Sequence, residues 1–399
     1  MNKKGKTKKS IKKDTTIVNA GRHPEENFGV LNPPVYHAST IMFSSLEEYE
    51  AKDDNPYAIQ YGRTGTPTTF AFEEAVTELH EAFATIALPS GLAAIACAMT
   101  ALLKKGDHAL IPDNVYGPTR HRVAKHVLGR AGVDVTYYDP LIGKKIDQLI
   151  RPETKLIYME SPGSVTFEVQ DIQSIVSICK KSNIITLMDN TWASPYFLQP
   201  ITLGIDIVIE AATKYIVGHS DVMMGIVTVN NDEHFRLIKY NANAYGYHAA
   251  PDDCYLAARG LRTLSVRLER HQKNATEVAS WLMGQDEVEH VLYPALPTDK
   301  GHALWKRDFK GASGLFSVVL DKEFSRKSFA RMLDSFKFFP IGASWGGYES
   351  LCLPVDLKKI RTVSPVEFDG YVLRLHIGLE NTGDLIEDLQ DGLKRLSAS

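Results

Sequence analysis

The chain has 399 residues, of which 44% are apolar, so it can bury at least one large core and we expect two or three structural units. Its formal net charge is −3 and its sequence pI is about 6.5, which argues against a nucleic-acid partner because there is no global positive field. No stretch approaches the uninterrupted apolar length of a transmembrane helix, so we expect no membrane partner.

The N-terminus differs from the rest of the chain, because residues 1–13 hold seven lysines and no acidic residue. This segment lacks the apolar core of a signal peptide and the arginine-rich character of a transit peptide. We therefore expect a disordered basic tail, and the alternative is an arm that binds nucleic acid.

Proline-containing turns interrupt residues 14–61, notably at Asn32–Pro34 and Asp53–Pro56, too often for long helices. The sequence therefore predicts an extended N-terminal arm. Such an arm must lie on another surface, because it has no core of its own.

Two segments offer groups that suit a phosphate. The first contains Tyr61 and Arg63 beside glycines that permit a tight backbone, and the forked guanidinium of Arg63 matches a phosphate. The second passes from an apolar stretch at 86–88 through Ser90 and Gly91 into a helix of small residues. The start of such a helix presents free amides to an anion, although an ordinary capped helix explains this second segment equally well.

Strands and helices then alternate along the chain. Apolar runs at 108–112, 133–138 and 156–159 predict strands, and the pattern at 172–180 predicts a helix. This alternation indicates an α/β fold with a mostly parallel sheet. Tyr116 follows the first of these strands, where its ring could stack on a planar ligand, although plain packing is the alternative.

Two strand ends in the middle of the chain carry opposite charges. The apolar run at 184–188 ends in Asp189, and the run at 205–209 precedes Lys214. Open α/β sheets bind ligands at the carboxyl ends of their strands. A lysine nucleophile beside a carboxylate suits pyridoxal 5′-phosphate (PLP), since the lysine binds the cofactor covalently and the acid keeps its ring nitrogen protonated. The alternative is a pair of solvated loop charges.

The pattern changes after residues 259–263, where a long helical stretch leads to a new strand at 314–320. We therefore expect a cofactor-binding domain over 62–258 and a C-terminal domain over 259–399. Within the latter, Arg374 alternates with apolar residues on a strand, where an unpaired charge is costly. Either a ligand carboxylate or a protein acid such as Glu380 should meet it.

The four cysteines are widely spaced and form neither a CxxC motif nor a pattern with histidine. This argues against a disulfide framework and against a metal site. It suggests a reducing compartment, and we expect a cytoplasmic protein.

Three motifs occur in the order found in one enzyme family: residues 189–193, residues 212–221 and residues 374–380. From about residue 15 to its end, the chain resembles the PLP-dependent enzymes of cysteine and methionine metabolism, the cystathionine synthases and lyases of fold type I. The resemblance implies a mostly parallel central sheet, an extended N-terminal arm and a smaller α/β C-terminal domain, as in the aspartate aminotransferase-like PLP-dependent transferases.

The resemblance also assigns roles to residues. Lys214 would bind PLP covalently and act in catalysis, Asp189 would pair with the ring nitrogen, and Tyr116 would stack on the ring and also act in catalysis. The family builds each site across a dimer interface and commonly forms tetramers, so the neighbouring subunit would supply Tyr61 and Arg63. The phosphate would be bound by Ser90, Gly91, Leu92 and Thr213, and the amino-acid substrate by Arg374, Ser344, Trp345 and Tyr61. One departure is Ala211, where many members have serine.

Two further motifs, residues 160–164 and 344–350, resemble the β-lyase branch of the family. The γ-synthases and γ-lyases usually carry asparagine in the first motif and leucine in place of Trp345, and methionine γ-lyases tend to have cysteine in place of Pro118. The resemblance thus implies β-elimination of cystathionine to homocysteine, pyruvate and ammonia in methionine biosynthesis, with β-elimination of cysteine or cystine as an additional activity.

Two alternatives stay open. One is a γ-lyase, γ-synthase or sulfhydrylase reaction on the same scaffold. The other, from a different functional class, is a catalytically silent protein that binds the cofactor or a nucleic acid, which only the lysine-rich tail suggests.

Overall fold

The computed structural model describes residues 11–51, 58–321, 324–357, 360–363 and 368–398. Most of the expected basic tail, residues 1–10, lies outside the described residues. Its last residue, Lys13, is the first residue of helix α1 (Lys13–Asn19) and donates from Nζ to the Pro195 carbonyl at 2.6 Å. Lys13 is therefore part of the ordered structure and not of a disordered tail.

The central sheet has seven strands in the order β1-β7-β6-β5-β4-β2-β3. The five strands from β6 to β3 are parallel, and β7 runs antiparallel to both of its neighbours. This confirms the predicted α/β fold with a mostly parallel sheet. In chain order the strands are β1 (Ala84–Leu88), β2 (His108–Pro112), β3 (Asp134–Tyr138), β4 (Thr154–Glu160), β5 (Ile185–Asp189), β6 (Ile207–Glu210) and β7 (Gly225–Val229).

Helices cover both faces of this sheet, which explains why its strands read as continuous apolar runs. Along β6, Ile207 and Ile209 face one hydrophobic cluster and Val208 faces another, as the two-residue period of a strand requires. The first cluster includes buried residues of α4 (Gly91–Leu102), the π-helical segment η3 (Thr119–Leu128) and α8 (Asp232–Ala244). The second includes those of α3 (Pro67–His80), α6 (Ile172–Ser182) and α9 (Pro251–Leu261). Shorter helical segments are η4 (Gly143–Leu149), η5 (Pro200–Leu203), α5 (Gly129–Ala131) and α7 (Ser194–Phe197).

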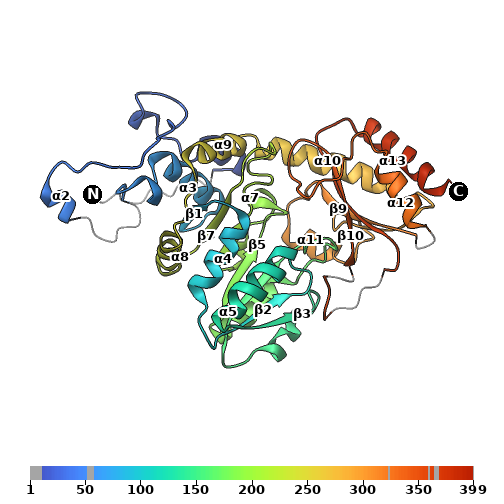
Figure 1. Cartoon of the computed structure of the whole chain (residues 1–399), viewed down its shortest axis with the longest axis horizontal. Coiled ribbons are helices and arrows are strands. Elements are labelled where there is room, and N and C mark those ends of the chain that lie inside the picture. Colours follow the sequence, from blue (N-terminus) through green and yellow to red (C-terminus); the bar gives the residue numbers. More distant parts are fainter. Residues whose placement is uncertain (1–10, 52–57, 322–323, 358–359, 364–367, 399) are drawn as a thin grey trace.

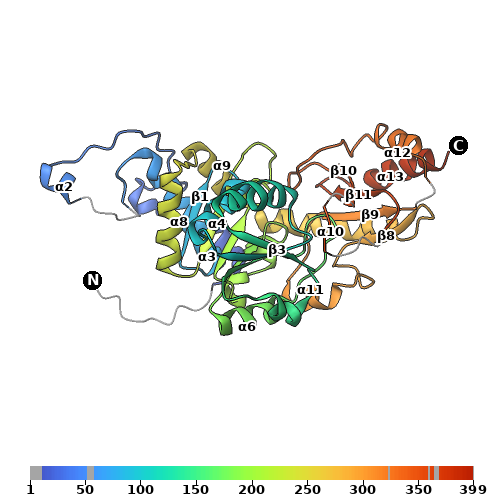
Figure 2. The ribbon, with the colours of Figure 1, turned by 60° about the horizontal axis from the view of Figure 1, so that its bottom comes forward.

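A second, antiparallel sheet of four strands in the order β10-β11-β9-β8 forms the C-terminal part of the molecule (Figures 1 and 2). Its strands are β8 (Val288–Leu292), β9 (Leu315–Leu320), β10 (Leu351–Val355) and β11 (Val372–His376). The accompanying helices are α10 (Leu264–Leu282), α11 (His302–Asp308), α12 (Arg326–Leu333) and α13 (Thr382–Ser397).

The predicted domain boundary between residues 258 and 259 falls inside α9, which continues to Leu261. Helix α9 packs along α3, whereas α10, which begins at Leu264, packs against β8, β9 and α13. Arg267 of α10 ties the two parts together, since its guanidinium donates to the carbonyls of Tyr215 at 2.7 Å and Gly260 at 2.8 Å.

The N-terminal arm is bonded to the rest of the chain at its beginning and at a few points farther along, for example where the Tyr36 amide donates to Thr68 Oγ1 at 2.8 Å. Arg262 donates to the carbonyls of Ile17 and Ala20 at 2.7 and 2.8 Å, which fixes α1. No residue from 22 to 51 is buried, although the segment contains η1 (Pro24–Glu26) and α2 (Leu46–Glu50). In Figure 1 this segment reaches away from the central sheet at the left. The short helix η2 (Gly62–Thr64) comes later in the chain, directly after Tyr61. The arm thus leaves large apolar side chains exposed: Phe28, Val30, Leu31, Met42 and Leu46.

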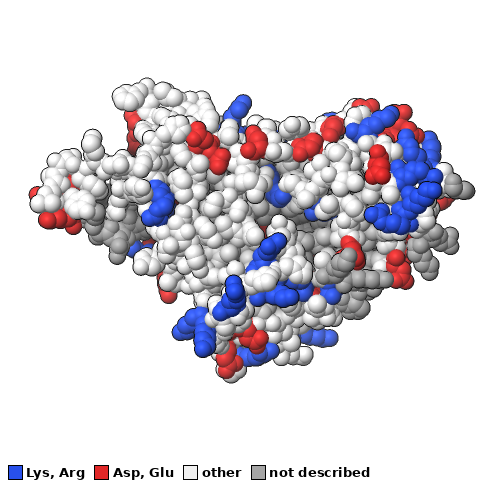
Figure 3. Space-filling view, viewed as in Figure 1, with Lys and Arg blue, Asp and Glu red and all other residues white. Residues whose placement is uncertain are grey.

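The four cysteines are free and buried, namely Cys97, Cys179, Cys254 and Cys352. In the part of the chain that the structure describes, no helix has the length and apolar character needed to cross a membrane. On the face drawn in Figure 3, basic and acidic side chains are interspersed, and acidic side chains lie at the left end of the arm.

Candidate active site

Lys214 and Asp189 lie at the same edge of the central sheet. Asp189 is the last residue of β5, and Lys214 follows the end of β6 at Glu210. These strands are parallel neighbours in which Asp189 pairs with Ile209, so both side chains follow strand ends on the carboxyl side. This is the edge at which open α/β sheets bind their ligands.

The Lys214 amine is held by a loop of the C-terminal domain. Its Nζ donates to Ser344 Oγ at 2.6 Å and lies 5.2 Å from the centre of the Trp345 indole. Burial lowers the pKa of Lys214 to about 8, helped by the positive charge of Arg374 and opposed by Asp189. A lysine with such a pKa is partly neutral near pH 7, as a nucleophile and base must be.

The Asp189 carboxylate is oriented by its own strand end and by β4. Its Oδ1 accepts from the Thr191 amide at 2.9 Å, and its Oδ2 accepts from the Tyr158 hydroxyl at 3.4 Å. Burial raises the pKa of Asp189 to about 6, the bonds from Thr191 oppose this, and the charge of Glu210 adds to it. Asp189 is therefore a partly desolvated carboxylate that suits a cationic partner.

Tyr116 joins this edge through a residue that the sequence analysis did not single out as a site residue, Glu160. The backbone amide of Tyr116 donates to Glu160 Oε2 at 2.8 Å, and Ser164 Oγ donates to Oε1 at 2.6 Å. Glu160 pairs in register with Asp189 on the neighbouring strand. Its burial and the charge of Asp189 raise the pKa of Glu160 to about 8. Burial, Asp189 and Glu160 raise the pKa of Tyr116 as well.

The start of α4 lies against the loop that carries Lys214. Ser90 caps this helix by accepting from the Ala93 amide at 3.1 Å, which leaves the first amides, those of Gly91 and Leu92, without intrahelical acceptors. A Cβ on Gly91 would lie 2.7 Å from the Ala211 Cβ, so only glycine allows this approach. Two free amides at a helix start suit a phosphate.

Thr213 lies in the same loop, but its hydroxyl is already engaged. It donates to the Met224 carbonyl at 3.1 Å and accepts from the Met224 amide at 2.8 Å. A phosphate bond from the Thr213 hydroxyl requires the first of these bonds to be given up. The predicted phosphate role of Thr213 therefore has less support from the geometry than that of the helix start.

Arg374 stands on β11 and faces this site without a carboxylate partner among the described residues. Its Nη2 donates to the carbonyls of Ala343 at 3.0 Å and Ser344 at 3.2 Å. Glu380 accepts instead from the amide and hydroxyl of Ser350, at 2.7 and 2.9 Å. The alternative pairing of Arg374 with Glu380 is thus wrong. Burial lowers the pKa of Arg374 to about 10, which marks a desolvated cation able to bind an anion.

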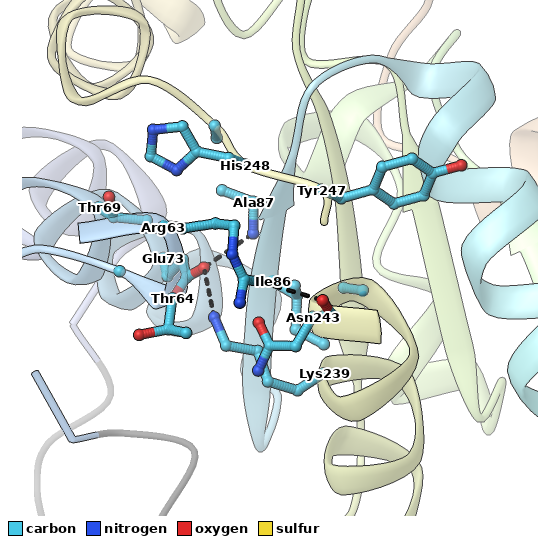
Figure 4. A pocket seen from close by; sticks show the side chains of 13 residues that line it. Arg63, Thr64, Thr69, Glu73, Ile86, Ala87, Lys239, Asn243, Tyr247 and His248 are labelled. Carbon is cyan, nitrogen blue, oxygen red and sulfur yellow. Dashed lines mark hydrogen bonds and ion pairs between the residues drawn. The ribbon is translucent and has the colours of Figure 1, made fainter. Parts of the chain in front are cut away.

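Tyr61 and Arg63 are not bonded to the residues described so far. Arg63 instead donates to the Asn243 carbonyl at 3.0 Å, in a pocket that also contains Glu73 and Lys239 (Figure 4). Lys239 Nζ lies 4.0 Å from Glu73 Oε1, and both residues line that pocket. Tyr61 is 47% exposed. A single chain therefore joins neither Tyr61 nor Arg63 to Lys214 by a hydrogen bond or an ion pair.

Apart from Tyr61 and Arg63, the residues described above lie together and have the chemistry of a PLP site. The lysine amine, the carboxylate and the free helix amides match the aldehyde, the ring nitrogen and the phosphate of PLP, and the desolvated guanidinium suits an amino-acid carboxylate. A family model described as "Cys/Met metabolism PLP-dependent enzyme" matches residues 14–394. The chain belongs to this family. It is accordingly a PLP-dependent lyase of fold type I, and PLP is its cofactor.

Relatives and a solved structure place the chain within this family without fixing its reaction. A putative cystathionine β-lyase from Rhizobium johnstonii is 46% identical over 388 residues, covering 96% of each chain. An L-alanine/L-glutamate racemase from Wolbachia pipientis is 42% identical, covering 97% of this chain and 98% of that protein. A cystathionine γ-synthase from Xanthomonas oryzae, solved with aminoacrylate and cysteine, superposes with a TM-score of 0.89 at 30% identity, covering 97% and 99%.

The raised pKa of Glu160 predicts how stability depends on pH. The folded protein holds this proton up to about pH 8, whereas the unfolded chain releases it near the ordinary value of 4.5. Stability from this group is therefore full below pH 4.5 and is lost as the pH rises through 8. Glu160→Gln keeps an acceptor for Tyr116 and removes the titration.

The melting temperature of the wild type should fall more steeply between about pH 5 and pH 8 than that of Glu160→Gln, as measured by calorimetry or circular dichroism. The exposed Glu153 provides the matched control, because Glu153→Gln should keep the wild-type slope. Parallel curves for wild type and Glu160→Gln would show that Glu160 has no raised pKa.

Proposed function

We propose that this chain catalyses the PLP-dependent β-elimination of L-cystathionine to homocysteine, pyruvate and ammonia, a step of methionine biosynthesis. The observation that carries the proposal is the loop that brings Ser344 and Trp345 onto the Lys214 amine, beside the guanidinium of Arg374, which has no carboxylate partner among the described residues. The γ-synthases and γ-lyases usually have a leucine in place of Trp345, so this indole favours the β-lyase branch. The name of the Rhizobium relative agrees with this choice.

Each residue has a distinct part in the proposed reaction. Arg374 binds the substrate α-carboxylate with its planar fork, and Ser344 assists it. Lys214 Nζ, neutral near its lowered pKa, takes the proton from Cα. When bound, PLP supplies an electron sink for the charge that develops at Cα, and Asp189 keeps its ring nitrogen protonated.

Breaking the Cβ–S bond releases the homocysteine sulfur, which needs a proton, and leaves a three-carbon fragment that water converts to pyruvate and ammonia. The sulfur can receive its proton from the Lys214 ammonium or from the Tyr116 hydroxyl. The raised pKa of Tyr116 keeps its hydroxyl protonated, so it is available as this acid.

Product analysis separates this reaction from the other activities of the family. The purified holoenzyme with L-cystathionine should yield pyruvate and homocysteine in equal amounts, measured by a dehydrogenase-coupled assay and a thiol assay. Lys214→Ala should lower the rate by at least roughly a hundredfold, because one amine serves both the cofactor and the proton transfer. An active wild type that forms no pyruvate from cystathionine would refute the proposal.

A γ-reaction is the second candidate, favoured by the solved cystathionine γ-synthase with the same fold. A γ-lyase would produce 2-oxobutyrate and cysteine from cystathionine, and a γ-synthase or sulfhydrylase would consume cysteine or sulfide. The racemase among the relatives adds a third outcome, the appearance of D-alanine or D-glutamate, which chiral chromatography detects in the same preparation.

We further propose that the active enzyme is a homo-oligomer, a dimer with shared sites that can pair into a tetramer. The support lies in the arm, where no residue from 22 to 51 is buried and large apolar side chains face solvent. A second copy of the chain would cover this surface. Tyr61, the last residue of the arm, and Arg63 would then complete the site of the neighbouring subunit.

Subunit mixing tests the shared site. Arg63→Ala and Lys214→Ala are each expected to be nearly inactive, but a hybrid dimer contains one site with both residues intact. Activity should therefore return after the two proteins exchange subunits. The double variant Arg63→Ala/Lys214→Ala mixed with wild type is the matched control, since its hybrids should have no intact site. Proven exchange without recovery would place Arg63 in the site of its own subunit.

A further inference from the structure

A single loop of the C-terminal domain, residues 343–347, touches Lys214 at three points. Ser344 Oγ accepts from Lys214 Nζ at 2.6 Å, and the Trp345 indole lies 5.2 Å from the same nitrogen. Gly346 has a φ of +86°, and a Cβ there would lie 2.9 Å from the Lys214 Cα. The position of this loop therefore sets the surroundings of the Lys214 amine.

Two side chains of β11 hold this loop. Arg374 and His376 are two residues apart on the strand and so project from the same face of the sheet. Arg374 donates to the carbonyls of Ala343 and Ser344. His376 Nε2 lies 3.1 Å from the Gly346 amide nitrogen and 3.1 Å from the Gly347 carbonyl oxygen. It can bond only one of these at a time, but either tautomer holds the loop.

The two anchors differ in what a substrate would do to them. In the proposed function, the substrate carboxylate binds the guanidinium of Arg374, and the loop carbonyls must then share its donors. His376 is 1% exposed, so no substrate reaches its ring, and its bond to the loop persists. The bond from His376 can therefore hold the loop while Arg374 binds the substrate.

The surroundings of His376 keep its ring in place and uncharged. Its ring packs 5.2 Å from that of His271 and 5.9 Å from that of Tyr215, the residue after Lys214. Burial lowers the pKa of His376 well below its ordinary value, and the charges of His271, Arg374 and Lys214 act in the same direction. Its Nδ1 has no hydrogen-bond partner among the described residues, so the only bonds its ring makes there are those of Nε2 to the loop.

We propose that His376 is a positioning residue, which holds the 343–347 loop, and with it Ser344 and Trp345, on Lys214 while Arg374 binds the substrate carboxylate. The role of Arg374 in this statement rests on the proposed function. The contact of His376 with the loop does not.

The test compares three variants of the holoenzyme. His376→Leu removes the bond to the loop and replaces the ring with an apolar side chain of similar size. His376→Gln replaces Nε2 with an amide that can accept from Gly346 or donate to Gly347. His271→Leu is the matched control, because His271 is equally buried beside His376 but bonds the Ile377 carbonyl, at 2.8 Å, and not the loop.

Two readouts separate positioning from simple stability. The first is acrylamide quenching of Trp345, obtained by subtracting the signal of the same protein carrying Trp345→Phe. The second is the split between kcat and KM with cystathionine. In His376→Leu, the quenching constant of Trp345 should about double and kcat should fall roughly tenfold, the effect of losing one buried bond, while KM changes less because Arg374 is intact. In His376→Gln, the quenching constant of Trp345 and kcat should both return most of the way to their wild-type values.

His271→Leu should lower the melting temperature without changing the quenching of Trp345. Equal quenching of Trp345 in wild type and His376→Leu would overturn the proposal, and so would equal changes in His376→Leu and His271→Leu. If His376→Leu fails to fold, the comparison of His376→Gln with His271→Leu decides in the same way. The quenching of Trp345 can be measured whatever reaction the enzyme catalyses. A wild type that forms no pyruvate would therefore refute the proposed function without affecting the test of His376.

Discussion

The chemistry of this protein depends on the partial burial of the Lys214 amine near a cation and an anion that come from different domains. Asp189 arrives on the central sheet and Arg374 on the C-terminal sheet, and the two act on the pKa of Lys214 in opposite directions. Burial is the largest cause of the lowered pKa, so the domains must stay closely packed. Arg267 supports this packing by bonding α10 to the backbone of Tyr215, directly after the lysine.

The unfavourable features of the fold gather around the same amine. Glu160 is a buried carboxyl beside Asp189, and Arg374 is a desolvated cation without a carboxylate partner among the described residues. Each costs stability in the isolated chain. Their concentration at one sheet edge is what a site shaped for a charged cofactor and a charged substrate requires.

Much of this arrangement could be predicted from the sequence, because it depends on local patterns. The apolar runs before Asp189 and Lys214 predicted two strands, and parallel neighbours must end at the same edge. The antiparallel β7 between β1 and β6 was not predicted, since strand order depends on pairing between distant segments. The role of Glu160 as the acceptor for Tyr116 and that of His376 as a loop anchor depend on contacts over 44 and 30 residues, which no local pattern encodes.

The pKa of Lys214 tests the account most directly. In cofactor-free protein, the rate at which a limiting amine reagent labels Lys214, measured by mass spectrometry, should rise with pH to a midpoint of about 8. In Arg374→Leu the midpoint should move upward, because a nearby positive charge that opposes protonation has been removed. A wild-type midpoint at the ordinary lysine value of 10.5, or the same midpoint in both proteins, would contradict the account.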